Sequence, residues 1–554
     1  MNPPRKLKNA FLLCLILLIG LLLRLYNVNF PSIGYHNMQE NEQMSIAHNM
    51  EARHDYVTKV SYSGNAFGDG LPSVSDPQAP LVAYQTLAVW GLFGENLWGP
   101  RLFNIVFGVL SILVIYLVSC LLFDNRHISL FVALELAIMP LAVFFSRNLQ
   151  PESPALFFML LGSLFYLRAA SGGKAYNLIA GGVSFSAAWL YKFNFIIGAA
   201  PFLLYLPSMI GKRGDKDFAF RLTGLFLPYV VVPAYLLWAH LSGQPAFNGF
   251  DAGKLAEIFS YPYWKDHGKT IWWYIKDENF TLIFAISSAL GIAIAFFKRA
   301  NPAARYIIGW TLAAIPYAAL YSAAIPQNNY CQMPFLALVC VSTAYASSSI
   351  SVLVRKFIKK DPLIPILVVV IAASAPMVRD SILRMHSTVF AGVDVAGESL
   401  RDFTKPGERI FLLTHSQGYG IARYAHRYAG WTYDLEEFKY KEKRFGVRYI
   451  CIYPADFIRN LKRDRPELFG YMQENYRIKE IGMTEEPYRV YYMILEKGAG
   501  PEPQNFLESI SGQKFLKTIY KIAGKYVFFY AVRPVQGAPP APSMTQNTAG
   551  EGAG

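Results

Sequence analysis

Five ionisable residues stand where they could act together on a substrate that contains a phosphate. Glu40 and Glu42 lie in a polar stretch after the first apolar run, and Arg147, Glu152 and Lys192 lie near the ends of later runs. A carboxylate can accept the proton of an attacking hydroxyl group as a general base. A cation can neutralise the charge that develops on a departing phosphate. A pair of acids could instead bind a divalent metal ion, although this spacing does not specify one.

Each of these residues also has a simpler explanation from local structure. Acids are favoured at helix N-termini, where Glu42 and Glu152 are expected. Arg147 can mark a membrane interface, and Lys192, a lone cation between two apolar runs, can extend its aliphatic stem toward polar surroundings. The chemical interpretation therefore depends on whether the fold brings these residues to one place.

Composition indicates a membrane protein. Of 554 residues, 53% are hydrophobic and only 16% are charged, and the mean hydropathy is +0.25. Soluble proteins carry about 25% charged residues. The five cysteines include no Cys-x-x-Cys pair, so neither a disulfide framework nor a zinc site is indicated. These values exclude a disordered chain, a coiled coil and a small secreted module.

Eleven apolar runs, each near the length of a membrane-spanning helix, recur as far as residue 378 and then stop. The predicted spans are 10–23, 102–123, 128–145, 154–170, 175–191, 195–210, 222–241, 279–297, 304–323, 331–350 and 362–378. The shorter run 80–93 is predicted to be an interfacial helix. The first span shows no cleavage site after it, so we expect it to be retained.

Basic residues predict the orientation of these spans. The net charge is +14, but many of the cations fall in four short stretches beside apolar runs, which is typical of cytoplasmic loops rather than of a nucleic-acid-binding surface. These stretches contain Arg5, Lys6 and Lys8; Lys212, Arg213, Lys216 and Arg221; Lys298, Arg299 and Arg305; and Arg355, Lys356, Lys359 and Lys360. We therefore expect a cytoplasmic N-terminus, with the loop 27–101 and all five candidate residues at the outer face.

A second domain is expected after the membrane segments. Residues 409–414, 447–453 and 488–495 are rich in β-forming residues, and helical patterns cover 418–428, 455–476 and 505–523. The sequence thus predicts a mainly α polytopic membrane domain over 1–378, with about eleven transmembrane helices and additional juxtamembrane helices. It also predicts a soluble periplasmic α/β domain over 379–534 and a disordered tail over 535–554, which is rich in Gly, Pro and Ala.

Several of these motifs, in this order, resemble those of the GT-C superfamily of glycosyltransferases. The resemblance is to family 39, the protein O-mannosyltransferases and lipid A aminoarabinose transferases, and it covers nearly the whole chain. The motifs are Gln39-Glu40-Asn41-Glu42, Ala79-Pro80-Leu81, Pro100-Arg101-Leu102-Phe103, Ser146-Arg147-Asn148-Leu149-Gln150-Pro151-Glu152, Tyr191-Lys192 and Asn328-Asn329-Tyr330.

The resemblance implies an inverting transfer from a polyprenyl-phosphate sugar to a lipid, glycan or protein acceptor at the periplasmic face of the inner membrane. Glu40 or Glu42 would be the first acid and Glu152 the second. Arg147 and Lys192 would bind the donor phosphate. Asn328 and Tyr330 would contact substrate. Many relatives carry Asp-Glu where this chain has Gln39-Glu40, while others have a single acid that aligns better with Glu42, so the identity of the base stays open. A Lys that is common in relatives is Gln78 here, which removes one expected phosphate contact.

Two other classes of function remain. Glu135 lies inside a predicted span, where a transporter could keep a proton or ion site. The alternative for Glu135 is a carboxylate paired within the bundle. A non-catalytic envelope membrane protein with the C-terminal domain as its binding module is the third class.

Overall fold

The computed structural model describes residues 3–63, 67, 78–210, 216–244, 255–299, 301–358, 360–414, 416–498 and 512–534. The chain divides into two compact units. Unit 1 comprises Met1–Lys59 and Val74–Thr388, and unit 2 comprises Val60–Ser73 and Val389–Gly554. The division lies ten residues beyond the predicted boundary at 378, because the last helix of unit 1 continues to Ser387.

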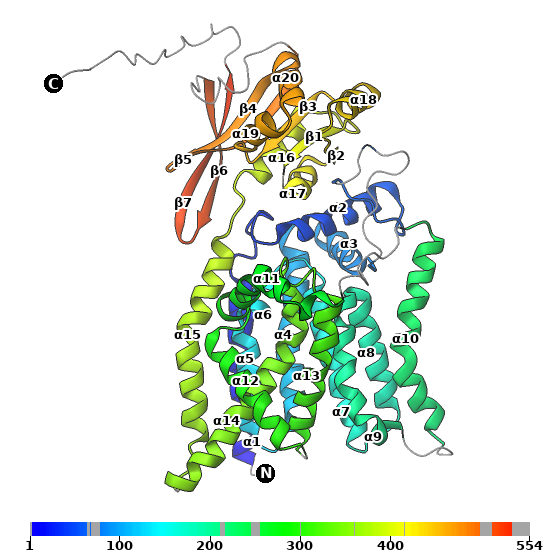
Figure 1. Ribbon diagram of the computed structural model, residues 1–554, viewed down its shortest axis with the longest axis vertical. Helices are drawn as coiled ribbons and strands as arrows, with labels where there is room; N and C mark the ends of the chain where they lie inside the picture. Colours follow the sequence, from blue (N-terminus) through cyan, green and yellow to red (C-terminus); the bar gives the residue numbers. More distant parts are fainter. Residues whose placement is uncertain are drawn as a thin grey trace, which may run out of the picture. The chain divides into compact units, whose positions relative to one another are not determined.

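The elements of unit 1 in the described residues are all helices. Its helices are α1 (Pro3–Leu25), α2 (Asn37–Arg53), α3 (Leu81–Phe93), α4 (Trp98–Leu122), α5 (Arg126–Ile138), α6 (Pro140–Arg147), α7 (Glu152–Ala170), α8 (Tyr176–Tyr191), η1 (Phe193–Tyr205), α9 (Leu206–Ile210), α10 (Phe218–Leu241), η3 (Glu257–Phe259), α11 (Tyr261–Trp273), η4 (Tyr274–Asn279), α12 (Leu282–Phe297), α13 (Pro302–Leu320), η5 (Asn329–Phe335), α14 (Leu336–Ile358) and α15 (Leu363–Ser387). Figure 1 shows the long helices of this unit gathered into one bundle.

The prediction of a polytopic helical protein is confirmed. Among the residues described, seven helices are long and apolar enough to cross a membrane, or up to nine if two bent helix pairs each count as one span. Every predicted span falls on a helical segment. Helices α8 and α13, however, are not among the helices that are both long enough and apolar enough to cross a membrane. The short apolar helix α3 forms where the interfacial helix was predicted.

A break between α5 and α6 places Arg147. The two helices meet at Pro140 with a bend of 55°. Proline has no N–H to donate to the preceding turn and its ring clashes with that turn, so it bends or ends a helix. Helix α6 then ends at Arg147, and the loop 148–151 leads into α7, whose first residue is Glu152. This loop is where most of the candidate residues meet.

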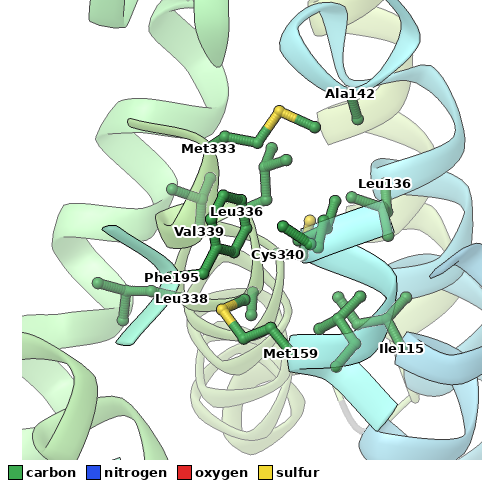
Figure 2. Packing of buried hydrophobic residues seen from close by; sticks show 14 of the residues in the cluster. Ile115, Leu136, Ala142, Met159, Phe195, Met333, Leu336, Leu338, Val339 and Cys340 are labelled. Atoms are coloured by element: carbon green, nitrogen blue, oxygen red, sulfur yellow. The ribbon is translucent and has the colours of Figure 1, made fainter. Parts of the chain in front are cut away.

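The core beneath that loop is built from several helices. Figure 2 shows Met159 of α7, Phe195 of η1 and Met333 of η5 packed near Cys340 of α14, with Leu136, Ala142 and Ile115 from the neighbouring helices. Close helix contact is also made by glycines: a Cβ on Gly182 of α8 would lie 2.2 Å from the carbonyl oxygen of Gly224 on α10. Small residues of this kind allow close helix approach in membrane bundles.

Unit 2 is the predicted α/β domain. Its elements are α16 (Val393–Phe403), β1 (Ile410–Thr414), α17 (Gly418–Ala425), β2 (Ala429–Gly430), α18 (Leu435–Phe445), β3 (Tyr449–Tyr453), α19 (Phe457–Asp464), α20 (Pro466–Asn475), β4 (Tyr476–Glu485), β5 (Tyr488–Lys497), β6 (Gly512–Ile522) and β7 (Lys525–Pro534). They form a seven-stranded sheet in the order β2-β1-β3-β5-β4-β7-β6, which Figure 1 shows with its helices.

The sheet is mixed. Strand β1 pairs in parallel with β2 and β3, and every other pair is antiparallel. Strands β1 and β3 are buried at every position, as continuous apolar strands in the middle of a sheet should be. Helices α18, α19 and α20 contribute Phe438, Leu461 and Met472 to the core beside these strands.

The strands predicted at 409–414, 447–453 and 488–495 correspond to β1, β3 and β5. The helix predicted over 505–523 is wrong for residues 512–522, which form β6. Their apolar residues fit a helical repeat, but they also alternate along an edge strand, and pairing with β7 selects the strand. Residues 505–511 and the predicted disordered tail, 535–554, lie outside the described residues.

Candidate active site

The structure brings Lys192 and Glu152 together. Lys192 follows the last residue of α8, and Glu152 is the first residue of α7. The ammonium group of Lys192 forms an ion pair with Oε1 of Glu152, with only 9% of the lysine side chain and none of the glutamate side chain exposed. A buried charge is costly unless it is paired, so each residue stabilises the position of the other.

Tyr330 completes this site from a third segment. The Nζ atom of Lys192 lies 4.2 Å from the centre of the Tyr330 ring, a cation–π distance. The Tyr330 hydroxyl accepts a hydrogen bond of 3.0 Å from Nε2 of Gln39, at the start of α2. The structure does not bring Asn328 into this group: its side chain bonds the carbonyl of Ala324, within its own turn.

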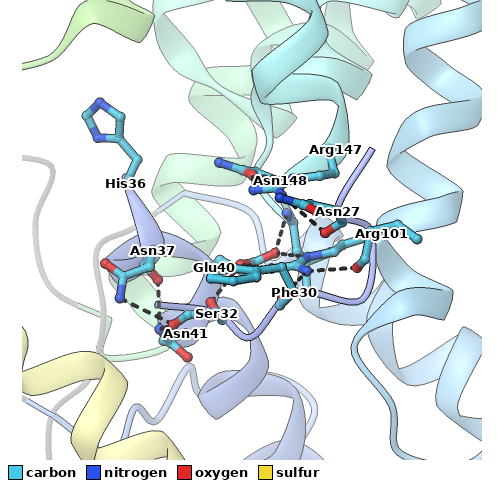
Figure 3. A network of polar contacts seen from close by, with 12 residues as sticks. Asn27, Phe30, Ser32, His36, Asn37, Glu40, Asn41, Arg101, Arg147 and Asn148 are labelled. Carbon is cyan, nitrogen blue, oxygen red and sulfur yellow. Dashed lines mark hydrogen bonds and ion pairs between the residues drawn. The ribbon is translucent and has the colours of Figure 1, made fainter. Parts of the chain in front are cut away.

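Glu40 lies in a separate network at the start of α2, shown in Figure 3. Arg101 of α4 donates to both of its oxygens, at 2.7 Å each, and the Ser32 hydroxyl and the Leu149 amide donate at 2.6 and 3.0 Å. Burial opposes ionisation, but the charge of Arg101 and these hydrogen bonds outweigh it and lower the pKa of Glu40 to about 2. A carboxylate with four donors and so low a pKa is poorly suited to accept a proton.

Arg147 belongs to the Glu40 network. Its guanidinium group donates to the carbonyl of Asn27 at 3.2 Å and to Oδ1 of Asn148 at 3.1 Å, and it lies 5.6 Å from the ring centre of Phe144. Its charge contributes to the low pKa of Glu40. Arg147 is thus held by backbone and amide oxygens. It is close to Glu152 in the sequence, but it is not among the groups that contact Lys192.

The loop after Arg147 joins the two networks. Its Leu149 amide bonds Glu40, and its Gln150 side chain donates to the carbonyl of His36 at 2.7 Å. Asn104 of α4 fixes the loop by donating to the carbonyls of Asn148 and Gln150. The start of α2 and the start of α7 therefore meet through this loop, although more than a hundred residues separate them.

Glu42 is half-buried, two residues beyond Glu40 on α2. A small cavity opens next to it. The lining residues are Gln43, Ile46, Lys59, Gln78, Ala79, Pro80, Val82, Pro151 and Tyr191. Two of the lining residues, Pro151 and Tyr191, immediately precede Glu152 and Lys192 in the chain. Lys59, which is buried, donates to the carbonyl of Gln78 at 2.5 Å.

Besides Glu152, several residues with buried polar groups in these segments were not predicted. The buried acceptor atoms Oε2 of Glu152, Oε1 of Gln39, Oδ1 of Asn194, Oε1 of Gln150 and Oδ1 of Asn329 have no hydrogen-bond partner among the residues described, and neither does Nε2 of His36. Most buried polar atoms in proteins are hydrogen-bonded, so this concentration at one place indicates a site for a polar ligand. Amides are common in loops, so their residue types gave no signal in the sequence.

His36 lies beside Tyr330 and Asn329. It adopts a left-handed backbone conformation, with φ 55°, and its ring lies 5.2 Å from that of Tyr330 and 5.5 Å from that of Phe145. Figure 3 shows its side chain pointing away from the Glu40 network. Burial, followed by the charge of Lys192, lowers the pKa of His36 to about 4, although the neighbouring Asn329 amide opposes the shift. His36 is therefore neutral at pH 7.

Glu278 of η4 is a further buried carboxylate near this site. It accepts hydrogen bonds from the Tyr35 hydroxyl at 3.1 Å and from Nδ2 of Asn329 at 2.9 Å. It thereby positions the amide of Asn329, which lies beside His36. The sequence did not single out Glu278, because it lies in a charged turn, Lys276-Asp277-Glu278, that reads as an exposed loop.

The acids do not form a metal site in the part of the chain that the structure describes. No group of three or more His, Cys, Asp or Glu residues there is placed to hold a metal ion. Glu40 is occupied by Arg101, and Glu152 by Lys192. The donor set therefore does not fit the divalent ion that a pair of acids could have bound.

Part of the chain is similar to a known family. Residues 77–238 match the family described as dolichyl-phosphate-mannose-protein mannosyltransferase. No curated protein matches the chain. The matched segment contains Arg147, Glu152 and Lys192.

Solved structures share the architecture over most of the chain. The oligosaccharyltransferase AglB from Archaeoglobus fulgidus, in complex with an inhibitory peptide and a dolichol-phosphate, is 13% identical, with a TM-score of 0.57 over 88% of this chain and 74% of its own. ArnT from Cupriavidus metallidurans in the apo state is 13% identical, with a TM-score of 0.56 over 87% of this chain and 97% of its own. ArnT bound to undecaprenyl phosphate is 12% identical, with a TM-score of 0.52 over 88% and 98%.

At these identities the structural matches establish the fold, and the family match covers the segment that carries the ion pair. The chain thus has the fold of these solved structures, and its residues 77–238 are similar to the mannosyltransferase family.

Proposed function

We propose that the chain is an inverting glycosyltransferase that moves a sugar from a polyprenyl-phosphate donor to a hydroxyl or phosphate group of a glycan, lipid or protein. The observation that carries this proposal is the buried Lys192–Glu152 ion pair, surrounded by polar atoms without partners. Such a site offers a cation, a carboxylate and free acceptor groups, which this reaction requires. Solved structures with this fold have been obtained with dolichol-phosphate and undecaprenyl phosphate.

Lys192 is the proposed ligand of the donor phosphate. As the bond between the anomeric carbon and the phosphate oxygen breaks, negative charge grows on the departing polyprenyl phosphate. A buried cation stabilises such charge strongly, because little water screens it. Tyr330 holds the lysine stem in place from one side. Arg147, held by Asn27 and Asn148, is the proposed second phosphate ligand.

Glu152 is the proposed general base. Its Oε1 atom pairs with Lys192, whereas its buried Oε2 atom has no partner among the described residues and can accept the proton of an attacking hydroxyl. When a phosphate draws Lys192 toward itself, the negative charge of Glu152 is less neutralised and its basicity rises. The acceptor oxygen then attacks the anomeric carbon, its proton passes to Glu152, and the phosphate leaves with the bonding electrons.

The two first-loop acids receive different roles. Glu40 is saturated by Arg101, Ser32 and Leu149, so we assign it the task of fixing α2 against α4 and the loop 148–151. Glu42, half-buried near the cavity, is the alternative base. Gln39, the residue before Glu40, donates a hydrogen bond from its Nε2 atom to Tyr330 of the Lys192 site. A carboxylate at position 39 would have faced the reacting groups, but this chain has an amide there.

Sugar hydroxyl groups are hydrogen-bond donors, and the unpartnered atoms near Lys192 are mostly acceptors. Oδ1 of Asn329, Oδ1 of Asn194 and Oε1 of Gln39 are proposed to accept from the sugar, together with neutral His36 through Nε2. Leaving such atoms without partners is costly, so a polar ligand that satisfies them binds with high selectivity.

We place this site at the outer face of the cytoplasmic membrane. The basic stretches of the sequence lie in loops that we predict on the opposite side of the membrane from the site, as cytoplasmic loops do. A site at that face can receive a lipid-linked sugar from the outer leaflet, and its acceptor would be a lipid, glycan or protein of the cell envelope.

Glu135 supports transport as a second function. It lies inside α5, is fully buried, and neither of its carboxylate oxygens has a partner among the residues described. A lone buried carboxyl group in a membrane helix suits proton binding. Proton flux that is lost in Glu135→Gln vesicles, with sugar transfer unchanged, would assign this second activity.

The test of the main proposal is an assay with purified protein in detergent or nanodiscs and a panel of polyprenyl-phosphate sugars. Wild-type protein should release polyprenyl phosphate from at least one donor when a membrane extract supplies the acceptor. Glu152→Gln is the inactive control, and Glu436→Gln, an exposed residue of unit 2, is the matched active control. Absence of release from every donor tested would oppose the proposal.

A further inference from the structure

The edge hairpin of unit 2 has two unlike faces. Strands β6 and β7 are paired along their whole length, from the pair Gly512–Pro534 to the pair Ile522–Lys525. The two turn residues between the strands, Ala523 and Gly524, have φ angles of 49° and 81°. Directly opposed residues of an antiparallel pair share a face, and alternate residues lie on opposite faces. On one face, Tyr520, Phe529 and Ala531 are at most 2% exposed, so that face packs on the domain.

The opposite face is apolar and exposed. It carries the pairs Leu516–Tyr530, Ile519–Phe528 and Lys521–Tyr526. Leu516, Ile519, Tyr526 and Phe528 are 52, 47, 66 and 48% exposed, respectively. Large apolar side chains scattered singly on a surface need no explanation, but four on one side of a single hairpin form a contiguous patch. We call these four residues the hairpin patch.

The hairpin is also strongly cationic. Residues 512–534 contain Lys514, Lys517, Lys521, Lys525 and Arg533 and no acid. Lys514 and Arg533 pair with acids of β4. The remaining three, Lys517, Lys521 and Lys525, make no ion pair with any residue that the structure describes. Lys521 lies on the face of the hairpin patch, Lys517 at the bulge in β6 and Lys525 beside the turn; we call these three the tip lysines. Lysines interleaved with aromatic and aliphatic side chains are typical of surfaces that enter the interface of an anionic membrane.

Chain connectivity keeps this hairpin near the bilayer. The Tyr520 hydroxyl of β6 accepts a hydrogen bond of 3.1 Å from the amide of Gly392 and also bonds Asp394. Gly392 follows Ser387, the last residue of the candidate membrane span α15, by five residues. Five residues reach no further than about 18 Å. Tyr520 of β6 is therefore bonded to a residue that lies only five positions along the chain from the end of a candidate membrane span.

We propose that the hairpin patch and the three tip lysines form a membrane-contact surface that binds the headgroups of anionic phospholipids. The apolar side chains enter the interfacial layer, and Lys517, Lys521 and Lys525 neutralise lipid phosphates. This contact holds unit 2 at the membrane surface independently of any catalytic activity.

The test uses the full chain in nanodiscs that contain nitroxide-labelled lipid. A fluorophore is attached at Ala523→Cys in the hairpin turn, or at Glu436→Cys on α18 as the control, after Cys14 and Cys120, the cysteines that are not buried, are replaced by alanine. Lipid quenching should be several-fold stronger at position 523 than at position 436 in discs with phosphatidylglycerol, and weaker at 523 in discs of phosphatidylcholine alone.

Charge reversal gives the second arm of the test. Replacing all three tip lysines by glutamate should reduce quenching at 523 to the level at 436, whereas replacing them by arginine should preserve it. Equal quenching at 523 and 436 in the anionic discs would overturn the proposal. Quenching at position 523 that changes neither with lipid charge nor with the glutamate substitutions would also overturn the proposal. The lipid comparison on the wild-type lysines decides the question even if the triple glutamate variant does not fold.

Discussion

Lys192 and Tyr330, which are 138 positions apart in the chain, lie with the lysine ammonium 4.2 Å from the centre of the tyrosine ring. The other neighbour of that ammonium is the carboxylate of Glu152. This arrangement leaves the cation buried and paired on two sides. Its remaining hydrogen-bonding capacity is what a donor phosphate would use.

Replacing Lys192 tests the role of that cation. We expect Lys192→Met to lower the rate of polyprenyl phosphate release by about 10²–10³-fold, the usual cost of removing one charge-stabilising donor. Lys192→Arg should restore part of the rate, because it keeps the positive charge. Rates are measured with saturating acceptor, and unfolding of each variant is followed alongside. Wild-type kinetics in a folded Lys192→Met protein would remove this residue from the mechanism.

Glu152 and Glu42 are compared as bases. Glu152→Gln keeps the size of the side chain but cannot take a proton, so transfer should fall by about 10²–10⁴-fold. Glu42→Gln is the parallel measurement under the same conditions. If Glu42→Gln alone lost activity while Glu152→Gln remained active, the general base would be Glu42 instead.

Arg147 should act on the donor rather than on the acceptor. Arg147→Gln is expected to raise the donor KM by about 10-fold or more, since a hydrogen bond to a charged group contributes roughly 1.5–3 kcal/mol. The acceptor KM should not change. Initial rates measured with donor and acceptor varied in turn give both values, and an equal rise in the two constants would place Arg147 in the framework of the fold.

The Glu40–Arg101 pair should stabilise unit 1. Removing one partner leaves the other charge buried without a counter-charge, at a cost of about 3–5 kcal/mol in the free energy of unfolding. We expect Glu40→Gln and Arg101→Met each to show such a loss, and the double variant to lose less than their sum. Glu436→Gln, which removes an exposed pair with Lys439, should change stability by less than about 1 kcal/mol. Additive effects of the two substitutions would contradict a coupled pair.

Asp394 makes the stability of unit 2 depend on pH. Burial raises the pKa of this carboxyl from 3.8 to about 6, against the opposing hydrogen bond from Tyr520. The folded state therefore holds the proton more tightly than the unfolded chain, so this stabilisation is complete below pH 3.8 and is lost as pH rises through 6. The shift corresponds to roughly 3 kcal/mol.

Asp394→Asn cannot ionise and so removes this dependence. We expect the variant to unfold at a higher temperature than wild type at pH 8, and the difference to shrink as the pH is lowered through 6. Near-ultraviolet circular dichroism during heating follows the transition. A difference that is the same at pH 8 and pH 4.5 would show that Asp394 does not titrate with a raised pKa.

The membrane helices could be predicted because apolar length alone determines them. Strands β1, β3 and β5 could be predicted for a related reason: β-branched and aromatic residues are concentrated in them. Residues 512–522 could not, because their apolar spacing fits a helix as well as a strand. Only pairing with β7, a long-range interaction, decides between the two.

The candidate site was partly predictable. Glu152 and Lys192 were identified because the predicted orientation of the spans brings both to one face of the membrane, although each charge alone also fits a helix end or an interface. The sequence could not show which of Glu40 and Glu42 is available as a base, because the answer depends on the ion pair between Arg101 of α4 and Glu40. Nor could it find His36 or Asn194, whose significance lies in polar atoms left without partners in the fold.

The most direct test of the central claim is the initial rate at which the purified protein releases polyprenyl phosphate from a polyprenyl-phosphate sugar. Wild type, Lys192→Met and Glu152→Gln are measured side by side in nanodiscs of one lipid composition. The Lys192–Glu152 site predicts steady release by wild type and at least a hundredfold slower release, about 10² or more, by both variants. Equal release by all three folded proteins would contradict it.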